Sequence, residues 1–275
     1  MEDYQSFNLY KFFIEFKASF LKDFKIYIRY PSWFVSDLIS TPLWFLFFLL
    51  ALILFIPEPS SPTIYSIDYF FWGYVFVIFL ATSLWGIGHE IRTEQLEGTI
   101  EQLFLAPVSR LTLIIGRWAR TLIVDLMIIF YTLLLVKFFS NAKFNVFHPS
   151  LLLFAFVLIE VTILGLGLLF SALALKMKSY NSLTTLLFIT LTIVSGVYFP
   201  PSALPYPINM VSYSLPFTYL VDLLKYSALE IKTIIEISVE IPLSFLLASL
   251  TFLLGLFSFR WTERDLRKKG QIGFH

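Results

Sequence analysis

The sequence contains no cysteine, which excludes disulfide bonds, thiolate metal sites and a thiol nucleophile. Its three histidines, His89, His148 and His275, are scattered and suggest neither a haem site nor a catalytic triad. Neither a G-x-x-x-x-G-K-[ST] phosphate loop nor an H-E-x-x-H motif occurs. We therefore expect no catalytic residue, no metal and no cofactor in this chain, and an energised process would need a separate motor subunit.

Charged residues are also scarce. They make up 14% of the 275 residues, whereas 58% are hydrophobic and the mean hydropathy is +0.80. A soluble domain is about half apolar and about one quarter charged, so this composition is typical of a protein embedded in a bilayer. The net charge of +1 gives no electrostatic reason to expect a nucleic-acid partner.

Charges recur throughout residues 1–32, which is unlike a cleavable signal peptide. Five charges share one helical face: Lys11, Glu15, Lys22, Lys25 and Arg29. Aromatic rings occupy the opposite face: Phe13, Phe16, Phe20, Phe24 and Tyr27. We predict an amphipathic helix in the membrane interface, with these rings toward lipid. The alternative is a packed helix of a small soluble domain, although little polar chain remains to build one.

The apolar stretches within residues 33–260 predict a transmembrane domain of six helices in an all-α polytopic membrane protein. The expected spans are 34–56, 67–87, 111–139, 150–175, 182–199 and 241–259. The fifth is roughly 27 Å long at about 1.5 Å per residue and barely crosses a hydrocarbon core of about 30 Å. Residues 261–275 are expected to form a basic tail.

Residues 200–226 form an irregular segment between the fifth and sixth expected spans. Five prolines, at positions 200, 201, 205, 207 and 216, exclude one continuous helix. The aromatic and aliphatic residues between them do not fit a hydrated loop. We predict short, broken, re-entrant helices dipping into the outer leaflet.

The distribution of lysine and arginine predicts the orientation. With six spans and the N-terminus inside, sixteen of the 20 basic residues lie on the inner side, and Lys137, Lys143, Lys225 and Lys232 lie outside. By the positive-inside rule, both termini and residues 90–110 face the cytoplasm of a multi-pass cell-membrane protein.

Residues 90–108 form a polar island between two apolar segments. Glu90, Glu94, Glu97 and Glu101 are spaced by 4, 3 and 4 residues, so a helix would align them in one stripe. Gly98 can close that helix, Thr99 and Gln102 then read as a capping box, and Pro107 ends the next short helix. We interpret this element as a docking surface. The alternative is a solvated face paired internally with Arg92, Arg117 or Arg120.

Asp125 and Glu160 each lie about half-way across an expected span. Because an acid at a helix centre costs roughly 2.5–3.5 kcal/mol on insertion scales, it normally faces protein or water. The fifth span carries hydroxyls that include Thr185, Thr192 and Ser195. These five residues are candidates for a translocation path. Hydrogen-bonded acids locking adjacent helices, and plain helix packing in the fifth span, are the alternatives.

The segment EQLEGTIEQLFLAPVSRLTLIIGR resembles the signature of the ABC-2 type permeases, the transmembrane subunits of a class of ABC exporters. SGVYFPPSALPYPINMVSYSLPFTYLVD and the tail KKGQIGF are similar to the same family. The resemblance implies two permease domains working with two cytoplasmic ATPase subunits, which would bind ATP and Mg²⁺. It also implies that the first and fifth spans form the seam between permeases. On this resemblance the coupling residues are Glu94, Glu97, Gly98, Thr99, Glu101, Gln102 and Pro107.

The resulting hypothesis is a permease, expected as a homodimer, that exports an amphipathic, lipid-linked or drug-like substrate by alternating access. Export of a polysaccharide or lipid-linked glycan is the alternative within the transporter class. From other classes, a membrane-embedded lipid-modifying enzyme using Asp125 and Glu160, or a membrane anchor of a cytoplasmic complex, remain open.

Overall fold

The computed structural model describes residues 9–55, 67–87, 93–94, 96–98, 102, 108–140, 144, 146–177 and 180–269. Within these ranges the regular elements are helical, and no strand occurs. The elements are α1 (Leu9–Arg29), α2 (Pro31–Phe55), α3 (Ile67–Ala81), η1 (Thr82–Ile87), α6 (Arg110–Ser140), α7 (Pro149–Lys176), α8 (Tyr180–Val194), η2 (Pro201–Ala203), α9 (Ile208–Ser214), α10 (Pro216–Leu229) and α11 (Ile237–Lys269). Helices suit a bilayer because they satisfy their own backbone hydrogen bonds.

Five helical segments in the described chain are long and apolar enough to cross a membrane. They are Phe34–Ala51, Ile67–Ile87, Arg110–Phe139, Pro149–Lys176 and Ile237–Leu266. The prediction of a helical multi-pass protein is therefore confirmed. The last segment differs from expectation, because α11 begins before residue 241 and continues as one helix through residues 261–269, which the sequence had suggested as a tail.

The expected fifth span, residues 182–199, is shorter in the structure. α8 has 15 residues, or roughly 22 Å at about 1.5 Å per residue, and stops at Val194. Gly196 follows with φ of +76°, a left-handed conformation that ends a helix readily and that glycine adopts without strain. α8 is thus shorter than a hydrocarbon core of about 30 Å, and five rather than six described helices have full spanning length.

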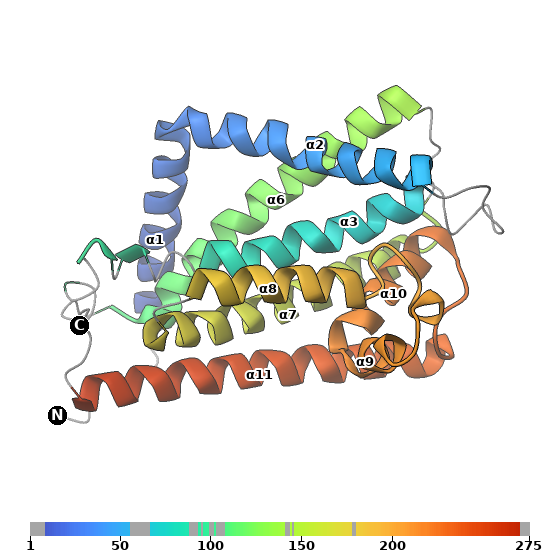
Figure 1. The fold of residues 1–275 in the computed structure, drawn as a ribbon. Coiled ribbons are helices and arrows are strands. Elements are labelled where there is room, and N and C mark those ends of the chain that lie inside the picture. The colour runs from blue at the N-terminus through green and yellow to red at the C-terminus, as the bar shows by residue number, and fades with distance from the viewer. Residues whose placement is uncertain are drawn as a thin grey trace.

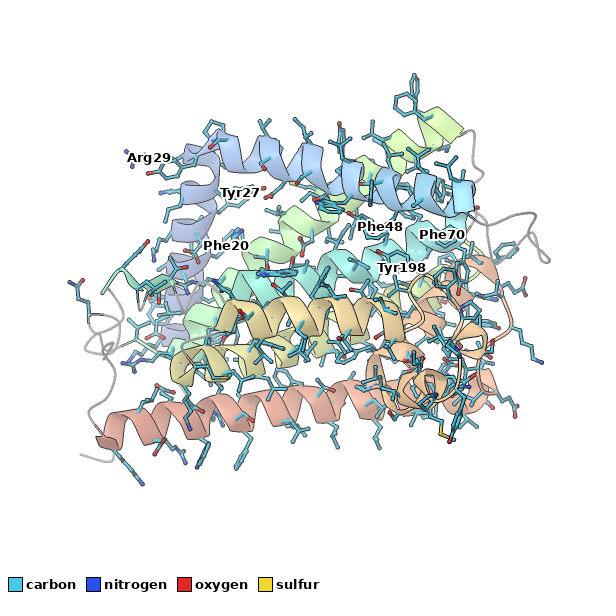
Figure 2. All side chains as sticks on the ribbon, viewed as in Figure 1. Phe20, Tyr27, Arg29, Phe48, Phe70 and Tyr198 are labelled. Atoms are coloured by element: carbon cyan, nitrogen blue, oxygen red, sulfur yellow. The ribbon has the colours of Figure 1, made fainter. Side chains whose placement is uncertain are left out.

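α1 lies across one end of the bundle, steeply inclined to the helices that run along it (Figure 1). It packs on α6, where the Ser19 hydroxyl donates to the Leu113 carbonyl over 3.1 Å. Gly116 permits this approach, because a Cβ there would lie 2.7 Å from the Ser19 Cβ. Tyr27, labelled in Figure 2, is buried and donates its hydroxyl to Asp37 over 3.0 Å. The expectation that the Tyr27 ring faces lipid is therefore wrong, since α1 turns that position toward α2 and α6.

α3 forms the centre of the bundle, and residues 69–80 are all buried. This helix contacts α2, α6, α7, α8 and α10, so it has no free face for lipid. α11 instead lies at the edge of the bundle against α7 (Figure 1). The backbones of these two helices touch where Gly255 meets Gly165, because a Cβ on Gly255 would be 2.0 Å from the Gly165 carbonyl oxygen.

The end of the bundle opposite α1 is closed by a cap made of η2, α9 and α10 (Figure 1). The Ser212 hydroxyl donates to the Val194 carbonyl over 2.6 Å, and the Thr218 hydroxyl donates to the Ser212 carbonyl over 2.6 Å. In this way side chains satisfy carbonyl groups that the broken helices leave free. The cap has the succession of short helices that the prolines predicted, and α10 continues to Leu229.

Candidate functional site

The polar island is described at residues 93–94, 96–98 and 102. The Glu97 amide donates to the Thr93 carbonyl over 2.9 Å, which closes one helical turn. Gly98 follows with φ of +70°, and nothing lies within 4 Å of the position that a Cβ would take there. Thr99, Glu101 and Pro107, which the sequence also assigns to this element, lie outside the described residues.

Arg117 of α6 holds the polar island to the bundle. Its guanidinium donates to Glu94 and lies 3.5 Å from an Asp23 carboxylate oxygen of α1. The three side chains retain between 9% and 16% of their surface, so the triad is largely shielded from water. Shielding strengthens such interactions relative to exposed pairs. Glu94 therefore makes the internal contact with Arg117 that the sequence left open as an alternative.

Further polar contacts join the helix ends around this triad. The Ser109 amide donates to Glu15 of α1 over 3.1 Å, and Arg110 at the start of α6 lies 3.7 Å from Glu263 of α11. Lys176 at the end of α7 lies 3.5 Å from Asp265 of α11. We call this end of the bundle, with α1 and these ion pairs, the α1 end. At this end Arg117 joins the polar island to both α1 and α6.

The exposed part of the polar island differs from its tethered part. Leu96 is 66% exposed, and Glu97, Gly98 and Gln102 are also exposed. Leu96 and Glu97 therefore present an apolar side chain and a carboxylate side by side to solvent. Among the described residues of the island, Leu96, Glu97 and Gln102 are thus accessible to solvent, whereas Glu94 is tethered to Arg117.

The two membrane acids meet in one interface. Asp125 of α6 accepts a hydrogen bond of 2.6 Å from Thr82 of η1, and Glu160 of α7 accepts one of 2.9 Å from the Trp118 indole. Asp125 and Trp118 both belong to α6, so the two hydrogen bonds lie along the same helix. The second carboxyl oxygen of Glu160 has no hydrogen-bond partner among the described residues. Each acid is thus bonded to a neutral donor on a neighbouring helical segment, which fastens η1, α6 and α7 together.

η1 is a turn of π-helix, a geometry that leaves carbonyl groups available and recurs at functional sites. The Tyr180 hydroxyl at the start of α8 donates to the Leu84 carbonyl over 2.6 Å. The Ser83 hydroxyl donates to the Ile163 carbonyl of α7 over 2.9 Å. The π-turn therefore lets α3 reach α6, α7 and α8 with polar contacts close to Asp125.

The hydroxyl candidates of the fifth span do not converge with these acids. Thr185 is exposed and donates to the Asn181 carbonyl of its own helix over 3.0 Å. Thr192 and Ser195 are buried near the end of α8, and their hydroxyls have no hydrogen-bond partner in the described part of the chain. The five path candidates consequently fall into separate groups, and the structure joins only Asp125 and Glu160 in one interface.

Lys225 of α10 is the residue that sequence reasoning missed. It is 1% exposed, and its ammonium donates to the carbonyls of Gly196 and Val197 over 2.8 and 2.7 Å. The same ammonium lies 3.4 Å from the centroid of the Tyr69 ring. Burial lowers the pKa of Lys225, and the charge of Asp222 acts in the opposite direction. A cation at the carboxyl end of α8 is favoured by the helix dipole and ties the cap to α8 and α3.

The sequence treated Lys225 as one of four outer cations. A lone lysine among leucines in LVDLLKY, one turn after Asp222, was the available signal for burial. Asp222 itself accepts the Ile234 amide over 2.7 Å, so it orders the connection between α10 and α11. Burial raises the pKa of Asp222, whereas this backbone hydrogen bond lowers it.

Comparison with known proteins complements this geometry. A family model described as ABC-2 type transporter matches residues 14–229, which include the polar island, both membrane acids and the cap. The match covers well over half of the chain. A search of curated proteins finds no match.

Proposed function

This chain belongs to the ABC-2 type transporter family, and we propose that it is the permease subunit of an ATP-driven exporter. The family comprises transmembrane components of ABC transporters rather than enzymes, and an ATPase partner generally works with them. The observation that carries the proposal is the match over residues 14–229, because it contains both the polar island and the cap, which interrupt the long apolar helices.

We infer that the exposed part of the polar island docks on a cytoplasmic ATPase subunit. Leu96 would enter an apolar depression of the partner, while Glu97 and Gln102 would fix its orientation. Glu94 would have a different role, since its contact with Arg117 couples the island to α1 and α6. The functional unit would contain two permeases and two ATPase subunits. Thr99, Glu101 and Pro107 remain proposed members of this surface.

The proposed export path lies between two copies of the chain. α2 supports this arrangement, because only 11% of the residues in its apolar stretch Phe34–Ala51 are buried within one chain. Figure 2 labels Phe48 of α2 and Tyr198, whose rings stack with centroids 5.1 Å apart and link α2 to the turn after α8. A seam bordered by α2 and α8 would suit an amphipathic, drug-like or lipid-linked substrate. ATP-driven motion of the polar island would rock the helices and open the seam below the cap by alternating access.

The docking proposal is tested by reversing the charge of Glu97. With Glu97→Lys we expect about tenfold weaker association with the cognate ATPase and a loss of transport-coupled ATP hydrolysis, because an interface charge would face a like charge. Co-purification and hydrolysis by reconstituted complexes measure the two effects. Glu236→Lys, an equally exposed acid before α11, is the matched control and should leave both unchanged. Unaltered association and hydrolysis with Glu97→Lys would show that the assigned role is wrong.

A further inference from the structure

Among the side chains that the structure describes in the last turns of α11, the acids and the bases have different surroundings. Glu263 and Asp265 pair with Arg110 and Lys176 of the neighbouring helices. Arg260, Arg264 and Lys268 are exposed, and none of them takes part in an ion pair with a described residue. These three residues recur every fourth position, so they form a basic stripe on the outer face of the helix. A solvated helix with interspersed charges would instead pair its bases along its own surface.

The basic stripe continues the apolar face of the same helix. At about 100° per residue, its members fall within about 80° of each other around the axis. The same sector contains four strongly exposed apolar side chains that precede it along α11. They are Leu246, Leu250, Leu253 and Phe257, with exposed fractions of 57%, 51%, 60% and 70%. One continuous face of α11 therefore changes from hydrocarbon to cationic between Phe257 and Arg260.

This change of character lies at the depth expected for lipid headgroups. α11 has 33 residues, or roughly 50 Å at about 1.5 Å per residue, and so extends beyond a hydrocarbon core of about 30 Å. Trp261 marks the boundary, because it is 58% exposed and Lys176 lies 4.1 Å from its ring centroid. Tryptophan beside lysine is typical of the membrane–water interface. The basic stripe spans about 12 Å from this boundary outward, within reach of phosphate groups.

We propose that the basic stripe, Arg260, Arg264 and Lys268, binds the phosphate groups of anionic phospholipids in the inner leaflet. The choice of leaflet rests on the orientation that accompanies the proposed function, whereas the choice of ligand rests on the helix face itself. Guanidinium groups bind phosphate through paired hydrogen bonds, and a cationic patch next to a membrane attracts anionic lipid. An acidic surface of the ATPase is the less favoured occupant, because the stripe shares its face with lipid-exposed leucines.

Lipid bound here would also act on the contacts of the α1 end. α11 lies at the bundle edge (Figure 1). Its last turns contact α6 and α7 through the ion pairs of Glu263 and Asp265. A headgroup held on the outer face would fix the depth of α11 while the acids on its other sides hold the neighbouring helices. The α1 end would thereby be anchored against the membrane plane.

The purified chain, reconstituted without an ATPase, provides the test. Spin-labelled phosphatidylglycerol and phosphatidylcholine serve as probes, and electron spin resonance measures the fraction of each that the protein immobilises. We expect a preference for phosphatidylglycerol that falls about fivefold for each charge removed in Arg260→Gln, Arg264→Gln and Lys268→Gln. High salt should abolish the preference of the unaltered chain, because it screens exposed charges.

Lys232→Gln, an exposed lysine near the cap, is the matched control and should keep the full preference. Retained preference in the triple glutamine variant would overturn the proposal. The proposal would also be overturned if the triple glutamine variant kept its lipid preference but no longer associated with the ATPase. That result would assign the basic stripe to the ATPase. Because the lipid measurement contains no ATPase and no transport step, failure of the docking proposal would leave its outcome unaffected. The unfolding temperature of each variant verifies that the bundle remains folded.

Discussion

The two ends of the bundle are held by different interactions. At the α1 end, side-chain ion pairs join segments that are far apart in sequence, with Arg117 at the centre and Lys176 at the edge. At the cap end, side chains bind backbone carbonyls instead, as Lys225 does at the end of α8 and Ser212 does at Val194. The pair of Lys176 and Asp265 is partly accessible to solvent and the Arg117 triad is largely shielded, whereas Lys225 and Ser212 are almost completely buried.

This difference bears on how each end can move. At the α1 end, the partly exposed pair of Lys176 and Asp265 can shift or exchange partners at small cost, since exposed pairs contribute about 0–1 kcal/mol. A buried ammonium bound to carbonyls cannot leave without exposing unpaired polar groups, each of which costs about 1–3 kcal/mol. The contact between α8 and α10 is therefore more costly to break than the partly exposed ion pair at the edge of the α1 end.

The strongest test of this comparison removes the Lys225 ammonium. Lys225→Met keeps the length of the side chain but leaves the Gly196 and Val197 carbonyls without their donor. We expect the free energy of unfolding to fall by about 3 kcal/mol, because two buried acceptors lose a hydrogen bond. Thermal unfolding in detergent measures the effect. The matched Lys232→Met change, at an exposed position, should leave the unfolding temperature almost unaltered. Equal effects of the two substitutions would contradict the contrast between the ends.

A smaller effect is expected at Arg117. Arg117→Gln removes the charge that faces both Glu94 and Asp23, so two largely shielded carboxylates lose their counter-charge. We expect a loss of about 2 kcal/mol in the free energy of unfolding, between the values for exposed and for buried pairs. Increased proteolytic accessibility near the polar island should accompany it, since Glu94 is then released. Lys232→Gln, at an exposed position near the cap, is the control. Unchanged accessibility with Arg117→Gln would mean that other contacts hold the island.

The smallest effect on stability is expected at Lys176, whose ion pair lies at the edge of the α1 end. Lys176→Gln breaks the pair with Asp265 and weakens the contact with Trp261, at a cost below about 1 kcal/mol. Raising the salt concentration should reduce the difference between this variant and the unaltered chain, because the pair is partly exposed and screened. The Lys225→Met effect should be insensitive to salt. A salt-dependent Lys225→Met effect, or a salt-independent Lys176→Gln effect, would contradict the difference in exposure between the two ends of the bundle.

Much of the fold was predictable, because hydropathy is a property of single segments. Four expected spans match helices of the structure closely, and the prolines of residues 200–226 correctly predicted short, broken helices. The end of α8 was not predictable from hydropathy, since residues 197–199 are again apolar, whereas the helix stops before the left-handed Gly196. Tyr27 was misjudged because facial periodicity distinguishes two faces of a helix but not which neighbour covers one of them.

The candidate site was likewise predictable only in part from the sequence. The acidic residues of the polar island could be recognised from their spacing, but their separation into a tethered Glu94 and an exposed Glu97 depends on where Arg117 lies. Asp125 and Glu160 were identifiable as costly membrane acids, whereas their donors, Thr82 and Trp118, come from helix packing. No local pattern contains these pairings, because the partners are 42 or more residues apart.

The sequence by itself determined that this is a helical, multi-pass membrane protein of the ABC-2 type, since composition, periodicity and motif are written along the chain. Only the tertiary structure decided which charges are buried, tethered or exposed. Lys225, Arg117 and Arg260 are equivalent in a count of basic residues. Their environments differ because the energy of a charge depends on the solvent and partners that surround it, and packing between distant segments sets both.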